Sequence, residues 1–191
     1  MILSEDNVDE QQAIRRLKNG DIDGLEFLVQ RHQAKATRVA YLVTQDLDLA
    51  EDVVQDSFIR AYRFIRSFDA TRPFEPWFLR SVVNASVKVM QRSAKQVDVL
   101  SDADDGEWAQ FLSGDESVEA QIESAQLQHR LWDAMQKLSP RQRAVIVQRY
   151  YLEMSEKEMA AEADVARGTV KWLLNAARER LRALLAERSE K

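Results

Sequence analysis

The 191-residue chain contains no cysteine and only two histidines, His32 and His129. The absence of cysteine excludes disulfides, thiolate metal sites and cysteine nucleophiles, and it fits a reducing cytoplasm. No apolar stretch approaches the roughly 18 residues that a membrane span needs, and residues 1–10 are acidic. We therefore expect a cytoplasmic protein with neither direct membrane insertion nor a signal peptide.

Glycine and proline are scarce, at five and three copies, and valine, isoleucine and threonine seldom form alternating runs. Apolar residues instead recur with the period of a helix. The predicted helices cover residues 8–18, 24–43, 49–67, 77–92, 156–163 and 167–185, and two more begin near 117 and 140. The predicted fold class is all-α. Two small helical domains, residues 1–95 and 119–191, are joined by an acidic flexible linker, residues 96–118.

The net charge of -5 disfavours nucleic-acid binding, but the charge is unevenly distributed. Residues 58–97 carry eight basic and two acidic groups, a net +6, and residues 98–129 carry nine acids and no lysine or arginine. Residues 130–152 and 167–182 each carry five basic groups and one acidic group, a net +4. A phosphate responds to charges within a Debye length of about 8 Å. We therefore predict two separate contacts with nucleic acid, with a larger partner supplying much of the affinity.

The first cationic segment also contains a cluster of rings. Pro73 and Pro76 predict a loop over residues 69–76, with Phe68, Phe74 and Trp77 in or beside it. Rings and cations together suit single-stranded nucleic acid, because bases stack on the rings and phosphates pair with the cations. The alternative is that the rings belong to the core, which is expected of Phe58 and is equally open for Trp77.

The helix after this loop has a polar face with one residue on each successive turn. Its residues are Arg80, Asn84, Lys88 and Arg92. An asparagine can both donate to and accept from the edge of an extruded base. The alternative for this face is ordinary solvation.

Asp52, Gln55 and Asp56 form an acidic patch on the preceding helix. Two carboxylates one turn apart could ligate a metal or act in acid–base chemistry. No histidine lies near them in the periodic pattern, so we predict no catalytic residue, metal or cofactor. A solvated face or a face that docks on another protein is the favoured interpretation.

The C-terminal sequence has the pattern of a helix-turn-helix. Ser139 and Pro140 begin one helix, and Ser155 with Glu158 predicts a capping box for a short one. A tight turn over residues 163–165 precedes a longer helix. Its outward residues are Lys171, Asn175, Arg178 and Arg182. In such motifs the second helix enters the major groove of DNA.

These motifs together resemble the extracytoplasmic-function (ECF, group IV) sigma factors, the minimal promoter-recognition subunits of bacterial RNA polymerase. The resemblance covers nearly the whole chain. Residues 17–29 resemble the opening of the family's first domain, and residues 50–58 resemble its most specific motif, which docks on the β′ clamp. Residues 68–84 resemble the segment that melts and reads the -10 element. Residues 138–178 resemble the domain that reads the -35 element.

The resemblance implies roles for individual residues. Those that would bind polymerase are Asp52, Gln55 and Asp56. Those that would bind the -10 element are Phe68, Phe74, Trp77, Arg80, Asn84, Lys88 and Arg92, with Asn84 where relatives hold a flipped base. Those that would bind the -35 element are Arg167, Thr169, Lys171, Trp172, Asn175 and Arg178.

The function implied by the resemblance is that of a non-enzymatic alternative sigma factor. It would bind promoter DNA and core RNA polymerase, through the β and β′ subunits, under the control of an anti-sigma factor. Two features depart from the family pattern. Lys88 stands where many members have an acidic or polar residue. Residues 172–177 replace a serine and further basic residues, which leaves fewer arginines to read guanine. Trp172 could instead pack on a sugar, on a thymine methyl group or on a protein partner.

Two other functions compete with this interpretation. One is an ordinary DNA-binding regulator with an N-terminal ligand-binding or dimerisation domain, which would bind duplex DNA without polymerase. The other is a helical metal-dependent enzyme, such as a phosphohydrolase, that uses Asp52 and Asp56. Neither predicts the basic, aromatic segment of residues 68–92.

Overall fold

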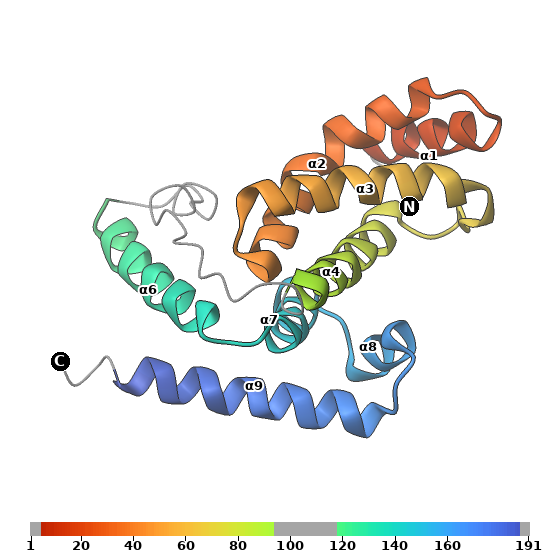
Figure 1. Ribbon diagram of the computed structural model, residues 1–191. Coiled ribbons are helices and arrows are strands. Elements are labelled where there is room, and N and C mark those ends of the chain that lie inside the picture. Colours follow the sequence, from red (N-terminus) through yellow and green to blue (C-terminus); the bar gives the residue numbers. More distant parts are fainter. Residues whose placement is uncertain (1–4, 94–117, 188–191) are drawn as a thin grey trace. The chain divides into compact units, whose positions relative to one another are not determined.

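The computed structural model describes residues 5–93 and 118–187, and every regular element in these ranges is helical (Figure 1). The chain divides into two compact units, residues 1–89 and 90–191. The all-α prediction with two helical domains is therefore confirmed. The predicted linker lies, apart from Val118, outside the described residues, so its boundaries and flexibility stay predictions.

The N-terminal unit consists of four helices and one 3-10 turn. They are α1 (Glu5–Lys18), α2 (Asp23–Thr44), α3 (Leu47–Phe64), η1 (Ile65–Ser67) and α4 (Phe74–Ser93). Helix α2 packs against both α1 and α3. The core residues are apolar side chains spaced three or four apart on each helix, including Leu28, Ala36, Val39, Val43, Val53, Val54, Phe58, Ala61, Phe78, Leu79, Val82 and Val83.

Two glycines position α1 against α2. Gly20 has φ +90°, a left-handed conformation that suits glycine, and it forms the turn after α1. At Gly24 a Cβ atom would lie 2.3 Å from the Ala13 carbonyl oxygen, so the two backbones approach too closely for a larger residue. The sequence alone does not predict this close contact, because it depends on how the two helices pack.

The start of α4 corrects the predicted loop over residues 69–76. The helix begins at Phe74, so Pro76 lies inside its first turn. Proline is tolerated there because the first N–H groups of a helix have no partner within the helix. The loop itself is shortened to residues 68–73, where the Asp69 carboxylate accepts hydrogen bonds from the Thr71 amide (3.0 Å) and hydroxyl (2.7 Å).

The C-terminal unit consists of α6 (Val118–Gln136), α7 (Pro140–Ile146), the π-helical turn η2 (Val147–Tyr151), α8 (Glu156–Ala163) and α9 (Arg167–Glu187). Helix α9 packs against α6, α7 and α8. Both capping boxes are present, at Ser139 with Gln142 and at Ser155 with Glu158. Asp164 turns the chain with φ 51°, as a short polar residue can, and the predicted helix-turn-helix is confirmed.

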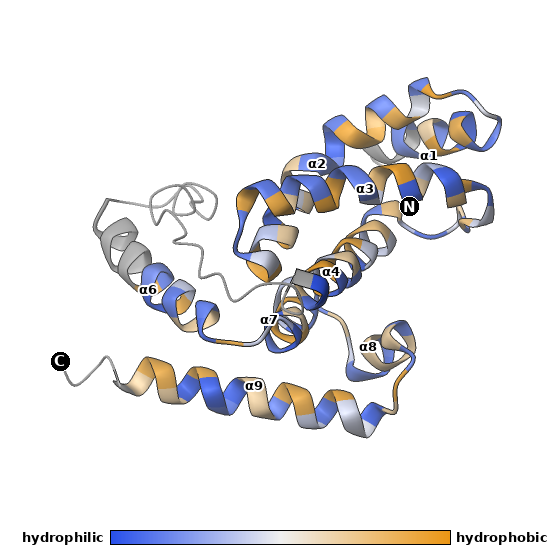
Figure 2. Cartoon of the chain, viewed as in Figure 1, coloured by the Kyte–Doolittle hydropathy of each residue, from blue (hydrophilic) through white to orange (hydrophobic). Residues whose placement is uncertain are grey.

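The core of this unit joins α7 to the helix-turn-helix. Its residues are Val145, Met154, Met159, Ala160, Val170, Leu174 and Ala177. Along α9 hydrophobic and hydrophilic residues alternate in the way expected of a helix that buries one face (Figure 2). Among the described residues, no helix is long and apolar enough to cross a membrane.

Candidate protein and nucleic-acid interfaces

The outward face of α3 presents two carboxylates that have no partner among the residues that the structure describes. Asp52 and Asp56 lie one turn apart and are exposed, as is Gln55 between them. None of these three side chains pairs with another described residue. Within residues 5–93 and 118–187, no group of three or more His, Cys, Asp or Glu could hold a metal ion. The geometry therefore leaves this acidic patch available to a partner protein.

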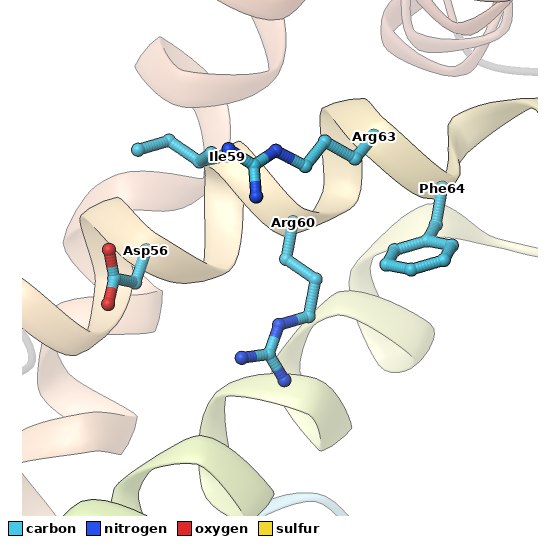
Figure 3. Close-up of a pocket in the computed structure, with 5 residues that line it drawn as sticks. All are labelled: Asp56, Ile59, Arg60, Arg63 and Phe64. Carbon is cyan, nitrogen blue, oxygen red and sulfur yellow. The ribbon is translucent and has the colours of Figure 1, made fainter.

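Beside the carboxylates, α3 forms a hollow lined by Asp56, Ile59, Arg60, Arg63 and Phe64 (Figure 3). Ile59 is 42% exposed and Phe64 is 60% exposed. Exposed apolar residues that gather among polar ones mark interaction surfaces more often than isolated ones do. The sequence analysis did not identify either residue. Both are apolar residues that lie outside the inner apolar stripe of α3, and that position in the helical pattern could have identified them.

The predicted aromatic loop is a packed cluster with one ring at its rim. Phe74 is fully buried and Phe68 nearly so. The Trp77 ring lies 4.8 Å from that of Phe68 and 5.5 Å from that of Phe74, measured between centroids, and Trp77 is only partly buried. In this structure Phe74 offers no surface to a base. The two phenylalanines therefore support Trp77, which is the ring that a base can reach.

The polar face predicted on α4 is present. Lys88 and Arg92 are exposed, whereas Arg80 and Asn84 are partly buried and each interacts with another group of the chain. These four residues repeat every four positions, so they follow one side of the helix from Trp77 onward. The arrangement places a ring, an amide and three cations in one line.

A buried ionic group that the sequence did not predict connects α1, α2 and α4. His32 is 1% exposed, and its Nε2 lies 2.8 Å from Oε2 of Glu10. A carboxylate can only accept, so Nε2 carries the proton. Arg31 Nε lies 3.5 Å from the same Glu10 oxygen, and Glu75 Oε2 lies 3.5 Å from His32 Nδ1. Glu75 also pairs with Lys35.

We expect the change Glu10→Gln to lower the free energy of unfolding by about 1–3 kcal/mol at neutral pH, because a buried charged hydrogen bond is lost. The hydrogen bond from His32 is the main cause that lowers the pKa of Glu10 below its ordinary value of 4.5. A carboxyl with a lowered folded-state pKa stabilises the fold above its unfolded-state pKa and loses that contribution as the pH falls through the folded-state pKa.

Urea unfolding followed by circular dichroism at neutral and acid pH measures this difference. The difference in the free energy of unfolding between Glu10→Gln and the unmodified chain should shrink as the pH falls below 4.5 and through the lowered pKa of the folded-state carboxyl. Glu26→Gln is the control, since Glu26 is exposed and bonds only to the exposed Gln30. A gap that stayed constant at acid pH would contradict this ionic role of Glu10.

In the C-terminal unit, the α9 residues that we predicted to bind DNA lie mostly at the surface. The exposed residues are Arg167, Thr169, Lys171, Trp172 and Asn175. Arg178 is partly buried, and its Nε donates to the Tyr150 hydroxyl at 2.8 Å. Tyr150, which the sequence did not mark as functional, therefore fixes the position of this guanidinium.

Two of the basic residues counted in segment 130–152 face the protein rather than solvent. Arg143 is 5% exposed, and its Nη1 donates to the Leu138 carbonyl at 2.9 Å. Burial lowers the pKa of Arg143 to about 10. Arg130 donates to the Leu185 carbonyl at 3.1 Å. The net +4 of this segment therefore overstates the charge that DNA would meet, although Lys137 and Arg141 of the segment remain exposed.

Comparisons with known proteins match both units. Residues 28–96 match the family Sigma-70 region 2, and residues 128–181 match Sigma-70, region 4. The ECF RNA polymerase sigma factor SigL of Mycobacterium tuberculosis is 32% identical over 164 residues, which is 85% of this chain and 89% of that protein. The chain is an ECF sigma factor of the sigma-70 family. SigW of Bacillus subtilis, also named an ECF sigma factor, is 29% identical over 93% of this chain and 97% of its own.

Solved structures agree with the fold of this ECF sigma factor. RpoE from Bartonella quintana, in complex with the anti-sigma factor NepR, matches with a TM-score of 0.61 and 24% identity over 83% of this chain and 96% of that one. CnrH, in complex with the cytosolic domain of CnrY, matches with a TM-score of 0.56 and 24% identity over 94% and 98%. The region 2 match contains the acidic patch and the α4 face, and the region 4 match contains the exposed start of α9.

Proposed function

We propose that this chain is a group IV, alternative sigma factor that binds core RNA polymerase and directs promoter-specific initiation of transcription. The observation that carries the proposal is that a region 2 and a region 4 occur in one chain, each with polar residues facing solvent. A simple DNA-binding regulator needs only the second of these. The family consists of transcription regulators, and we assign this member no catalytic residue and no cofactor.

The proposed contact with polymerase is the acidic patch of α3. Asp52, Gln55 and Asp56 would face the β′ clamp, while the C-terminal unit would complete binding with the β subunit. The support is that both carboxylates are exposed and unpaired with any described residue. A carboxylate that forms no ion pair within its own protein loses no such pair when it binds a cation on a partner.

The proposed contact with the -10 element is the line of residues along α4. Trp77 would stack on an unpaired base, and Asn84 would bond the edge of the flipped one. Arg80, Lys88 and Arg92 would pair with phosphates. Phe68 and Phe74 would not contact DNA directly but would hold the indole of Trp77 at the surface. Their burial and the short distances between their rings and that of Trp77 support this role.

The proposed contact with the -35 element is the exposed start of α9. Arg167, Thr169, Lys171, Trp172 and Asn175 would face the major groove, because the first residues of a recognition helix contact base edges. Arg178 would meet a phosphate, since its bond to Tyr150 sets its position near the groove edge.

We further propose that an anti-sigma factor controls this protein in the cytoplasm. The similar RpoE was solved with the anti-sigma factor NepR bound to it. An inhibitor that covered the acidic patch or the hollow beside it would exclude polymerase directly, because the two binding events would use one surface.

Transcription in vitro with core polymerase, this chain and a library of genomic fragments tests the proposal. Specific start sites should emerge that core polymerase alone does not use, with related sequences near -10 and -35. Mapping these starts also gives the promoters that the experiments below need. If the purified chain, free of any inhibitor, bound no core polymerase and supported no specific start, the proposed function would be wrong.

A further inference from the structure

We propose that Trp172 recognises the C5-methyl group of a thymine in the upstream promoter element, and that Gly168 leaves room for that base edge. The inference rests on the proposed function, because it concerns how α9 reads duplex DNA. It goes further by assigning the chemical group that is read and the residue that reads it.

Trp172 differs from the other large apolar side chains in its exposure to solvent. It is 69% exposed, more than any other large hydrophobic residue in the described part of the chain. Its neighbours Val170 and Leu174 are buried and anchor the helix, so the outward direction of the indole is fixed by packing. The fold therefore gains little from this ring, and an external contact accounts for its presence.

Gly168, one turn before Trp172, gives an independent indication. An added Cβ atom there would meet nothing within 4 Å, and the residue is not among the glycines with positive φ. Neither packing nor backbone conformation therefore requires a glycine, which helices disfavour. Side chains on a helix lean toward its N-terminus, so the indole leans over this bare position. The two residues together form an apolar ledge that is open to solvent.

The charge on α9 itself favours DNA as the occupant of the ledge. Arg167, Lys171 and Asn175 are exposed on the same helix, and residues 167–182 carry a net +4 from five basic groups and one acidic group. The thymine methyl is the apolar group that base edges offer in the major groove. A cationic helix with one exposed apolar ring fits a thymine-containing site better than it fits a protein surface.

The remaining donors on α9 strengthen the inference. Of the two arginines that we predicted to bind the -35 element, Arg178 bonds to Tyr150, and Arg167 Nε lies 3.6 Å from Oε2 of Glu156. Both of these guanidinium groups therefore have a partner within the protein, and each would have to leave it before it could read guanine, which arginine does by the commonest specific contact in the major groove. An apolar contact to the thymine methyl group would supply sequence discrimination that these arginines do not.

Replacing thymine by deoxyuridine tests the inference, because the change removes only the methyl group. The polymerase holoenzyme containing the full chain is bound to a mapped promoter in which each upstream thymine is replaced in turn. We expect one or two adjacent replacements to weaken binding about fivefold, the lower end of the cost of one mismatched base pair. Trp172→Ala should bind both forms equally, whereas Trp172→Phe should keep part of the preference.

Controls separate this inference from the proposed function and from misfolding. Thermal unfolding should be unchanged in Trp172→Ala, because the ring is exposed. Gly168→Ala should unfold at an equal or slightly higher temperature, because helices favour alanine over glycine, but it should lose affinity for the thymine promoter. Indifference of the unmodified holoenzyme to every replacement would overturn the inference. So would a loss in Trp172→Ala that is equal on all templates, which would indicate a protein contact. Failure of the proposed function shows earlier, as an unmodified chain that forms no holoenzyme.

Discussion

Changing Asp52 and Asp56 together to alanine is expected to lower the affinity of this sigma factor for core RNA polymerase about 100-fold or more. Removing one partner of a buried charge pair at an interface costs about 2–5 kcal/mol, and each 1.4 kcal/mol corresponds to about tenfold in affinity. Both side chains are exposed and unpaired with any described residue in the free protein. The stability of the free protein should therefore change by less than about 0.5 kcal/mol.

Titration of core polymerase with fluorescently labelled chain, at several salt concentrations, measures the loss. The double variant should also show a weaker dependence of affinity on salt, since two ion pairs are missing. Asp9→Ala with Glu26→Ala is the matched control, because it removes two exposed carboxylates from α1 and α2 instead. Unchanged affinity of the Asp52 and Asp56 variant, or an equal loss in the control, would contradict docking through the acidic patch.

Most helices of this protein could be predicted because their apolar residues follow one period. The inner stripe of α3 is an example: Val53, Ser57 and Ala61 are all buried as that period requires. The start of α4 could not be predicted in this way. A proline such as Pro76 disrupts the interior of a helix but is tolerated in its first turn. The sequence does not show whether the residues before Pro76 already belong to the helix, so it does not decide where α4 begins.

The candidate site residues also differ in whether a local pattern is enough to predict their exposure. Periodicity places Lys171 and Asn175 outward, because an exposed position depends only on the helix that carries it. Phe74 packs against the ring of His32, 42 positions earlier, so its burial could not be predicted from the local aromatic pattern. The hydrogen bond between Glu10 and His32 spans 22 positions of sequence, and no local pattern indicates it.

Asn84→Ala is expected to reduce formation of the open promoter complex about tenfold or more while leaving polymerase affinity nearly unchanged. Unpairing a base costs a few kcal/mol, and a protein must recover that cost through contacts with the flipped base. Loss of the amide would leave a hydrogen-bonding edge of the base without its partner, at about 1–3 kcal/mol. The acidic patch on α3 is a separate surface, so docking should persist.

Permanganate reactivity of the -10 thymines measures opening, and the labelled-chain titration measures docking on the same preparations. Gln91→Ala is the control, since it removes an amide from the same helix about two turns further on. If opening and docking fell together, the change would have disturbed the fold of the N-terminal unit rather than base capture. If opening were unaffected, Asn84 would not hold the flipped base, and Trp77 with the α4 cations would have to account for melting.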